Sequence, residues 1–263
     1  MSFDSYHWED FSVLDPGIAE HRENLFSGSG QPSDFLALLC SGDPVGVGVA
    51  LDQYSEAEAL TRFGTANPYG AHHLAVREAA RRVLEDPPYP SEADGDEGLN
   101  HASALLVLAH LATAEDGDRI ADILRTHPTP VVMNAAGRAA RCALMASETL
   151  NENLIDALSA ILLDESMSTR ERLDVLSAFA HLRDETVGDI LARTVRTPDT
   201  KLQVEVVVIL ASHFLATHME IVDEITAAWP KSPSPTQTRI LRAVDAAKNA
   251  SAGERTPDRP DTE

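Results

Sequence analysis

Apolar helical patterns alternate with short polar breaks along most of the chain. From about residue 99 onward, apolar residues recur every three or four positions, the spacing of a helix that is buried on one side. The pattern predicts helices over residues 32–41, 43–63, 68–84, 100–112, 116–125, 130–146, 151–163, 169–182, 186–195, 200–213, 219–229 and 236–248. The β-branched run at 204–210 is assigned to a buried helix, because the repeat requires a helix there.

Signals at the helix starts support this reading. Asp43 and Asn67 each stand directly before a proline, so each places a capping side chain before a proline at the first helical position. Three prolines lie within residues 86–98 and forbid a continuous helix there. That stretch is rich in acids without a basic residue, which predicts an acidic surface loop between repeats.

The tripeptide Ala-His-Leu occurs at residues 109–111 and again at 180–182. The two histidines, His110 and His181, are 181 − 110 = 71 positions apart, which two units of about 35 residues divide evenly. We interpret both as polar partners of helix ends rather than as catalytic groups. Such short units cannot each enclose a core and must stack. The sequence therefore predicts an all-α fold, a right-handed α-α superhelix built as a solenoid of antiparallel helix pairs.

Over roughly residues 43–248, the period, apolar pattern and helix lengths resemble the HEAT-like or armadillo-like helical repeat proteins. The HEAT pattern often has a proline within its first helix, whereas Pro130 and Pro198 only precede helices in this chain. The repeats are therefore divergent. The resemblance implies a surface that holds extended or basic partners.

Three regions are expected. Residues 1–30 interleave aromatic and acidic side chains, and they either pack over the first repeat as a cap, which we favour, or stay mobile until they fold on a partner. Residues 31–248 form the helical repeat domain. Residues 249–263 hold almost no apolar side chain and are expected to be a disordered tail.

The charge balance restricts the class of partner. The chain has 263 residues, with 21 Lys and Arg against 42 Asp and Glu, which gives a net charge of −21. Such a field repels phosphate backbones and anionic membranes and favours cationic surfaces, although acidity can also serve solubility alone. We expect no nucleic-acid or membrane partner. The N-terminus resembles no signal peptide and no apolar run reaches the ~20 residues of a membrane span, so we expect a cytoplasmic chain.

Reactive residue types do not form a recognisable site. Cys40 and Cys142 are too far apart for a CxxC motif and are expected to be inert core thiols. His72 and His73 would point about 100° apart on a helix, so they cannot easily share a metal ion. No serine elbow, phosphate loop or nucleotide fingerprint occurs. We therefore expect neither catalytic residues, nor a metal site, nor a cofactor.

Two sets of side chains are candidates for partner binding. Near the N-terminal end, an acidic-aromatic contact patch could form from Asp52, Tyr54, Glu56 and Tyr69. The alternative is that both acids are simply solvated while Tyr54 packs into the cap.

The second set consists of acids that recur at matching places in the second helices of successive units: Asp118, Asp122, Glu152, Asp156, Asp189, Asp223 and Glu224. Second helices usually line the concave side of a helical solenoid, so these carboxylates would line one groove. Random placement in so acidic a chain would also produce some matches.

These observations favour a non-catalytic protein that binds a basic protein partner. One version is an immunity protein that neutralises a basic toxin, because electrostatic steering gives the fast capture that an antidote needs. The alternatives are an accessory enzyme subunit, lyase-like or chaperone-like, and a scaffold in a larger assembly.

Overall fold

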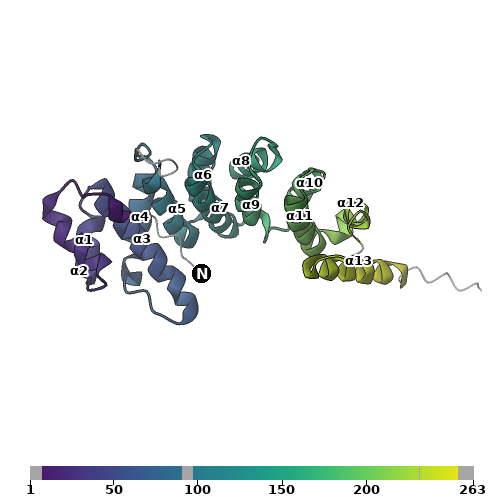
Figure 1. The fold of residues 1–263 in the computed structure, drawn as a ribbon, viewed down its shortest axis with the longest axis horizontal. Coiled ribbons are helices and arrows are strands. Elements are labelled where there is room, and N and C mark those ends of the chain that lie inside the picture. Colours follow the sequence, from purple (N-terminus) through teal and green to yellow (C-terminus); the bar gives the residue numbers. More distant parts are fainter. Residues whose placement is uncertain (1–7, 91–96, 231, 254–263) are drawn as a thin grey trace, which may run out of the picture. The chain divides into compact units, whose positions relative to one another are not determined.

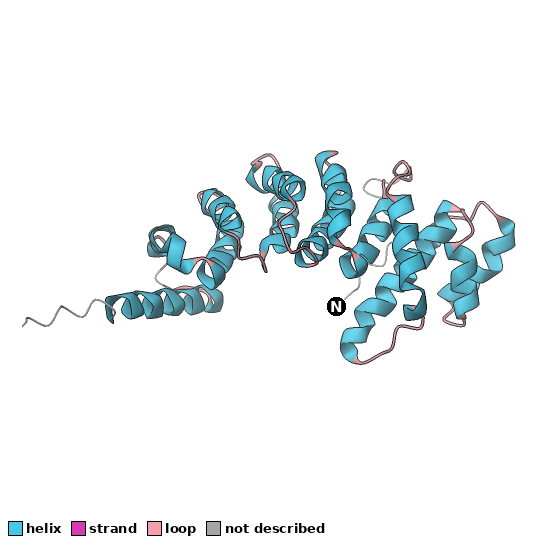
Figure 2. Cartoon of the chain, turned by 180° about the vertical axis from the view of Figure 1, so that it is seen from behind, coloured by secondary structure: helices cyan, strands magenta, loops and turns pink. Residues whose placement is uncertain are grey.

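The computed structural model describes residues 8–90, 97–230 and 232–253, and these residues form helices and connecting loops without a strand (Figure 2). The α-helices are α1 (Ala19–Phe26), α2 (Pro32–Leu39), α3 (Pro44–Leu60), α4 (His73–Val83), α5 (Leu99–Leu111), α6 (Gly117–Arg125), α7 (Pro130–Met145), α8 (Glu152–Leu163), α9 (Thr169–Phe179), α10 (Glu185–Thr194), α11 (Thr200–His213), α12 (Leu215–Ala227) and α13 (Pro235–Gly253). The all-α class is confirmed, and each helix expected from the apolar pattern is present, but α4 begins at His73 and not at Pro68, so Asn67 does not cap it as predicted.

Differences from the expected helices have local causes. The short helix α1 was missed because its sequence, AEHRENLF, buries only Leu25 and lacks an apolar stripe. Helix α13 continues to Gly253, so the prediction of a disordered tail from residue 249 is wrong for its first residues. That stretch is rich in alanine and holds no proline, so nothing stops the helix there. The remainder of the expected tail, residues 254–263, lies outside the described residues.

The chain divides into two compact units, each described by itself. The first unit holds residues 1–161 and 174–179, and the second holds residues 162–173 and 180–263. In the first unit α5 packs against α3, α4 and α7, and Figure 1 shows α5 between α3 and α7. Residues 99–108 of α5 are all buried, as expected for a helix that is apolar all round.

Hydrogen bonds join neighbouring helix pairs at offsets that range from 28 to 51 residues in sequence, and several lie between 32 and 35. In the first unit, Asn151 donates to Asp118 across 33 residues and Arg119 donates to Glu85 across 34 residues. In the second unit, the His213 ring and the Ala180 carbonyl oxygen are 3.0 Å apart and 33 residues apart in sequence. The helices α5, α7, α9 and α11 begin at residues 99, 130, 169 and 200, so successive pairs differ in length and a period of about 35 residues stays a prediction.

The second unit contains the β-branched run that we assigned to a helix. It lies in α11, where Leu202, Val206 and Leu210 are fully buried. The side chain of Arg172 is also buried, and it donates to the Leu162 carbonyl oxygen at 2.9 Å and to the Thr197 hydroxyl at 3.3 Å. These contacts fasten the start of α9 to the end of α8 and to the loop before α11.

Part of the N-terminal arm packs into the first unit. The Trp8 side chain is buried, and its Nε1 donates to Ser103 Oγ at 2.9 Å. A Cβ at Gly48 would lie only 2.4 Å from the Trp8 ring, so the ring needs a glycine beneath it. Phe11 and Tyr89 each lie 5.6 Å from the Trp8 ring and from each other, centroid to centroid. Residues 1–7, with the aromatics Phe3 and Tyr6 of the expected cap, lie outside the described residues.

Candidate protein-binding face

Four carboxylates surround a shallow recess on the first unit, and we call this surface the acidic face. It is formed by Glu85, Glu115, Asp118 and Asp122 around a hollow of about 380 Å³. Helix α6 buries Ile120 and Leu124, so Asp118 and Asp122, four residues apart, share its exposed side. The amphipathic pattern of α6 therefore determines where these two acids point.

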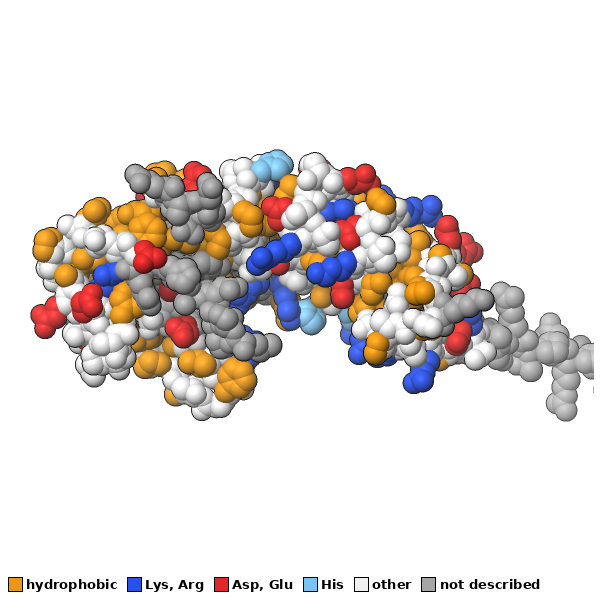
Figure 3. Space-filling view, in the orientation of Figure 1, with side chains coloured by type: hydrophobic (Ala, Val, Ile, Leu, Met, Phe, Trp, Pro, Cys, Tyr) orange, Lys and Arg blue, Asp and Glu red, His pale blue; other side chains and the backbone are white. Residues whose placement is uncertain are grey.

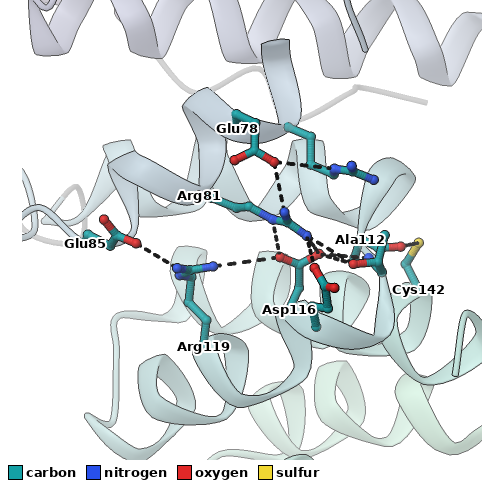
Figure 4. Close-up of polar contacts among 10 residues, drawn as sticks. Glu78, Arg81, Glu85, Ala112, Asp116, Arg119 and Cys142 are labelled. Atoms are coloured by element: carbon teal, nitrogen blue, oxygen red, sulfur yellow. Dashed lines mark hydrogen bonds and ion pairs between the residues drawn. The ribbon is translucent and has the colours of Figure 1, made fainter. Parts of the chain in front are cut away.

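A buried ion pair holds the elements that carry the acidic face. Asp116, directly before α6, is fully buried, and Arg81 of α4 binds its carboxylate with two nitrogens, Nε at 2.7 Å and Nη2 at 3.0 Å (Figure 4). The Thr113 backbone N–H donates to the same carboxylate at 2.8 Å, and Arg81 also donates to Glu78 at 2.9 Å. Bidentate geometry of this kind is the strong form of an ion pair.

The charge state of Asp116 follows from its partners. Burial acts to raise the pKa of its carboxyl group, but the hydrogen bonds from Arg81 and Thr113 and the positive charge of Arg81 outweigh burial, and the pKa lies below its ordinary value. The carboxylate thus stays charged and ties α4 to the start of α6.

Amide groups from the next helix pair support Asp118. The Nδ2 groups of Asn151 and Asn153, at the start of α8, donate to Asp118 Oδ1 at 3.1 and 3.0 Å. These hydrogen bonds hold the pKa of Asp118 below its ordinary value. Asp118 therefore keeps its negative charge, and the residue is exposed.

The other acids of this face are partly neutralised by arginines on the surface. Arg119 donates to Glu85 at 2.7 Å, and Arg125 donates to Asp122 at 2.9 Å. Glu115 is the most open, with 85% of its side chain exposed and its carboxylate 3.7 Å from Arg81 Nη2. Surface ion pairs are weak, so an incoming cation can replace them at little cost.

The expected contact patch near the N-terminal end is wrong, because three of its four residues are enclosed. Tyr54 and Tyr69 are 1% and 7% exposed, and both carboxylate oxygens of Asp52 are shielded from solvent. Glu56 is the exposed member. Helix α3 packs against α2, α4 and α5, which leaves little of it free, and Tyr69 stacks on Phe35 with ring centroids 4.2 Å apart.

Asp52 is a buried acid without an ionic partner. Burial raises the pKa of its carboxyl group to about 8, the Ser103 hydroxyl acts in the opposite direction, and the negative charge of Glu56 raises it further. The expectation that Asp52 belongs to a solvated face is therefore wrong as well. At neutral pH this group is mainly protonated.

The remaining predicted acids lie on α8, α10 and α12. Glu152 and Asp156 are exposed on the part of α8 that belongs to the first unit. In the second unit each predicted acid has a basic neighbour: Asp189 lies 3.8 Å from His218, Glu224 lies 3.9 Å from Arg196, and Asp223 pairs with Lys248.

Sequence reasoning missed two members of the acidic face, Glu85 and Glu115, and the Arg81–Asp116 pair beneath it. One signal was available. Thr113 and Asp116 form a capping box, in which each side chain accepts from the backbone of the other, and this motif is visible as Thr-x-x-Asp before an apolar run. The motif identifies Asp116 as a structural acid but does not reveal Arg81, 35 residues away.

Reactive groups elsewhere do not converge on a second site. Cys40 is exposed, so its assignment to the core is wrong, whereas burial raises the pKa of the Cys142 thiol. Cys40 lies at a separate hollow of about 680 Å³ between α3, α4 and the proline-rich loop, which is lined mainly by apolar side chains. Among the described residues, no group of three or more His, Cys, Asp or Glu side chains is placed to hold a metal ion. No helix in the described part is long and apolar enough to cross a membrane.

Comparison with known proteins identifies no relative. No protein-family model matches the chain, and neither the curated proteins nor the solved structures give a significant match.

Proposed function

We propose that this protein is a non-catalytic binding protein whose acidic face holds a basic surface of a protein partner. The observation that carries the proposal is the recess beside α6, where two carboxylates of α6 meet Glu85, after α4, and Glu115, before α6, on elements that the buried Arg81–Asp116 pair holds together. A pre-positioned cluster of like charge steers a cationic partner and sets its orientation.

The proposal extends to the architecture. Contacts between helix pairs at offsets of 33 and 34 residues support a divergent HEAT-like solenoid. In such a solenoid Glu152 and Asp156 of α8 would continue the acidic face beyond Asp118, because Asn151 and Asn153 already join the start of α8 to α6. An immunity protein that blocks a basic toxin is one concrete form of this function, and its cellular setting would be the cytoplasm.

The test neutralises three acids of the face by amide substitutions, which keep a side-chain oxygen as acceptor at each position and leave the buried Arg81–Asp116 pair intact. The variant Glu115→Gln/Asp118→Asn/Asp122→Asn should weaken binding of a small basic protein, cytochrome c, by about tenfold at low salt. A tenfold loss of affinity corresponds to about 1.4 kcal/mol, which the three lost charges share. A matched control, Glu205→Gln/Glu220→Gln/Asp245→Asn, removes the same charge from exposed positions on α11, α12 and α13.

The outcomes distinguish attraction by the acidic face from attraction by the net charge of the whole chain. The proposal predicts that the control keeps near wild-type affinity and that raising the salt to about 0.5 M weakens wild-type binding. Equal losses in the two variants would show that total charge, and not this face, attracts the basic protein. Affinity that is indifferent to salt would exclude electrostatic capture altogether.

A further inference from the structure

A second charged surface lies on other helices of the first unit. It consists of Arg62, which follows α3, and Arg138 and Arg141 of α7, and the charges of Arg62 and Arg138 act on His110 near the end of α5. We call it the arginine row. Helices α3 and α7 both pack against α5, so the three helices form neighbouring positions on one side of the unit (Figure 1).

Two hydrogen bonds establish the register of these helices. Ser55 Oγ of α3 donates to the Leu106 carbonyl oxygen of α5 at 3.5 Å, and Cys142 Sγ of α7 donates to the Ala112 carbonyl oxygen at 3.7 Å. The first bond places Ser55 of α3 beside Leu106, and the second places the C-terminal part of α7 beside the end of α5. Arg138 and Arg62 both lie close enough to His110 for their charges to act on its ring.

The arginines of α7 lack ionic partners. Arg81, Arg119 and Arg125 of the acidic face each bind a carboxylate, whereas within the described residues no hydrogen bond or ion pair joins the side chain of Arg138 or Arg141 to another residue. Both are exposed. Two exposed arginines without an ionic partner leave a local excess of positive charge on α7 in a chain with 42 acids and 21 basic residues.

His110 lies in the positive electrostatic field of the arginine row. Its Nε2 atom is buried, and among the described residues it has no hydrogen-bond partner. Burial lowers the pKa of the ring, Arg138 and Arg62 lower it further, and Glu58 opposes them. The ring is thus mainly neutral at neutral pH, and the positive charge of the surface comes from the guanidinium groups.

Large apolar side chains accompany the arginines. Phe63 follows Arg62 and is 71% exposed, and Met145, one turn after Arg141 on the same side of α7, is 60% exposed. Protein interfaces are enriched in arginine, methionine and aromatic residues and depleted in lysine and acids. Figure 3 shows basic side chains over the part of the chain where Figure 1 labels α7.

We propose that the arginine row is a second interaction surface, and that it binds an acidic protein segment that also carries apolar side chains. Carboxylates would meet the forked guanidinium groups of Arg138 and Arg141, and apolar side chains would cover Phe63 and Met145. The net charge of −21 repels any anion, so a segment with a few carboxylates and with apolar side chains for Phe63 and Met145 fits better than a nucleic acid, which carries a phosphate at every nucleotide.

A labelled peptide of Glu-Glu-Leu repeats is the probe, used at about 150 mM salt so that charges beyond about 8 Å are screened. The wild-type chain should bind it, and Arg138→Glu/Arg141→Glu should weaken binding by about tenfold or more. The matched control is Arg239→Glu/Arg242→Glu, which changes two exposed arginines with the same spacing on α13. The control should stay within about twofold of wild type.

A second variant tests the apolar part. Phe63→Ala/Met145→Ala leaves the net charge unchanged and should weaken the peptide by about threefold to tenfold, because each side chain loses apolar contact area. No binding by the wild type, or equal losses in the two arginine variants, would overturn the proposal. If a single-stranded oligonucleotide bound more tightly than the peptide, and Arg138→Glu/Arg141→Glu abolished that binding, the ligand of this surface would be a nucleic acid and the proposal would be wrong. Neutralising the acidic face should leave peptide binding intact, which separates this surface from the proposed function.

Discussion

Asp116 and Asp52 are both enclosed in the first unit, yet the structure leaves one charged and the other neutral at pH 7. Asp116 receives the two-pronged hydrogen bonds of Arg81, and its pKa lies below the ordinary value. Asp52 has no cation beside it, and burial raises its pKa to about 8. The partner, and not the depth, determines the charge of a buried acid.

The largest effect is expected when the partner of Asp116 is removed. Arg81→Met leaves a fully buried carboxylate without its cation, and we expect the free energy of unfolding to fall by about 3–5 kcal/mol. Urea unfolding measures this loss. Arg125→Met is the control, because Arg125 pairs with Asp122 on the surface and should contribute about 1 kcal/mol or less. Similar losses in both variants would mean that Asp116 is hydrated.

The second prediction contrasts the two acids by their pH dependence. Because the pKa of Asp52 is raised to about 8, the folded state holds a proton that the unfolded state releases above about pH 4, so Asp52 lowers stability as the pH rises from about 4 to 8. The slope is at most about 1.4 kcal/mol per pH unit. Asp116 acts in the opposite sense, since its lowered pKa gives stability that is lost as the pH falls below its ordinary value of 3.8.

Asp52→Asn should therefore flatten the stability profile between pH 5 and 8 and stabilise the protein more at pH 8 than at pH 5, as urea unfolding at several pH values would show. Asp116→Asn should leave the change of stability between pH 5 and 8 as it is in the wild type, while it lowers the stability at neutral pH. If Asp52→Asn is equally stable relative to wild type at both pH values, Asp52 is ionised in the folded protein.

The smallest effect concerns the hydroxyl between Asp52 and the N-terminal arm. Ser103→Ala removes the acceptor of the Trp8 Nε1–H and should cost about 1–2 kcal/mol, because a buried donor is left unsatisfied. It should also raise the pKa of Asp52 further, since the hydroxyl lowers that pKa. Ser212→Ala, an exposed serine bonded within α11, is the control and should change stability by about 0.5 kcal/mol or less. Trp8 fluorescence in a Trp229→Phe background would follow the arm.

The helices of the chain were largely predictable, and the candidate sites only in part. Asp43 caps α3 as expected, accepting from the backbone N–H groups of Val45 and Gly46 at 2.9 and 3.0 Å. Asp118 and Asp122 are exposed on α6, as partner-binding side chains must be, whereas their place in a common concave groove stays a prediction. These successes share a cause, because caps and amphipathic stripes involve residues within one or two turns.

The failures arise where the same helix meets several neighbours. On α3, Asp52 and Tyr54 lie in an apolar stretch whose buried side is not a single stripe, and only the packing of α2, α4, α5 and the Trp8 ring shows that both are enclosed. The arginine row was not predicted either, because a net charge of −21 indicates an acidic surface and does not show where positive charge is concentrated.

Local signals in the amino-acid sequence determined the all-α class and most of the helices, because caps and apolar stripes depend on residues that are close in the chain. Packing between helices decided which charges are neutralised and which are available. Arg81 reaches Asp116 across 35 residues, while Arg138 and Arg141 meet no acid in the described part of the chain. The Coulomb energy of two charges depends on their distance and burial in the folded molecule, and neither quantity can be obtained from the number of acidic and basic residues in the sequence.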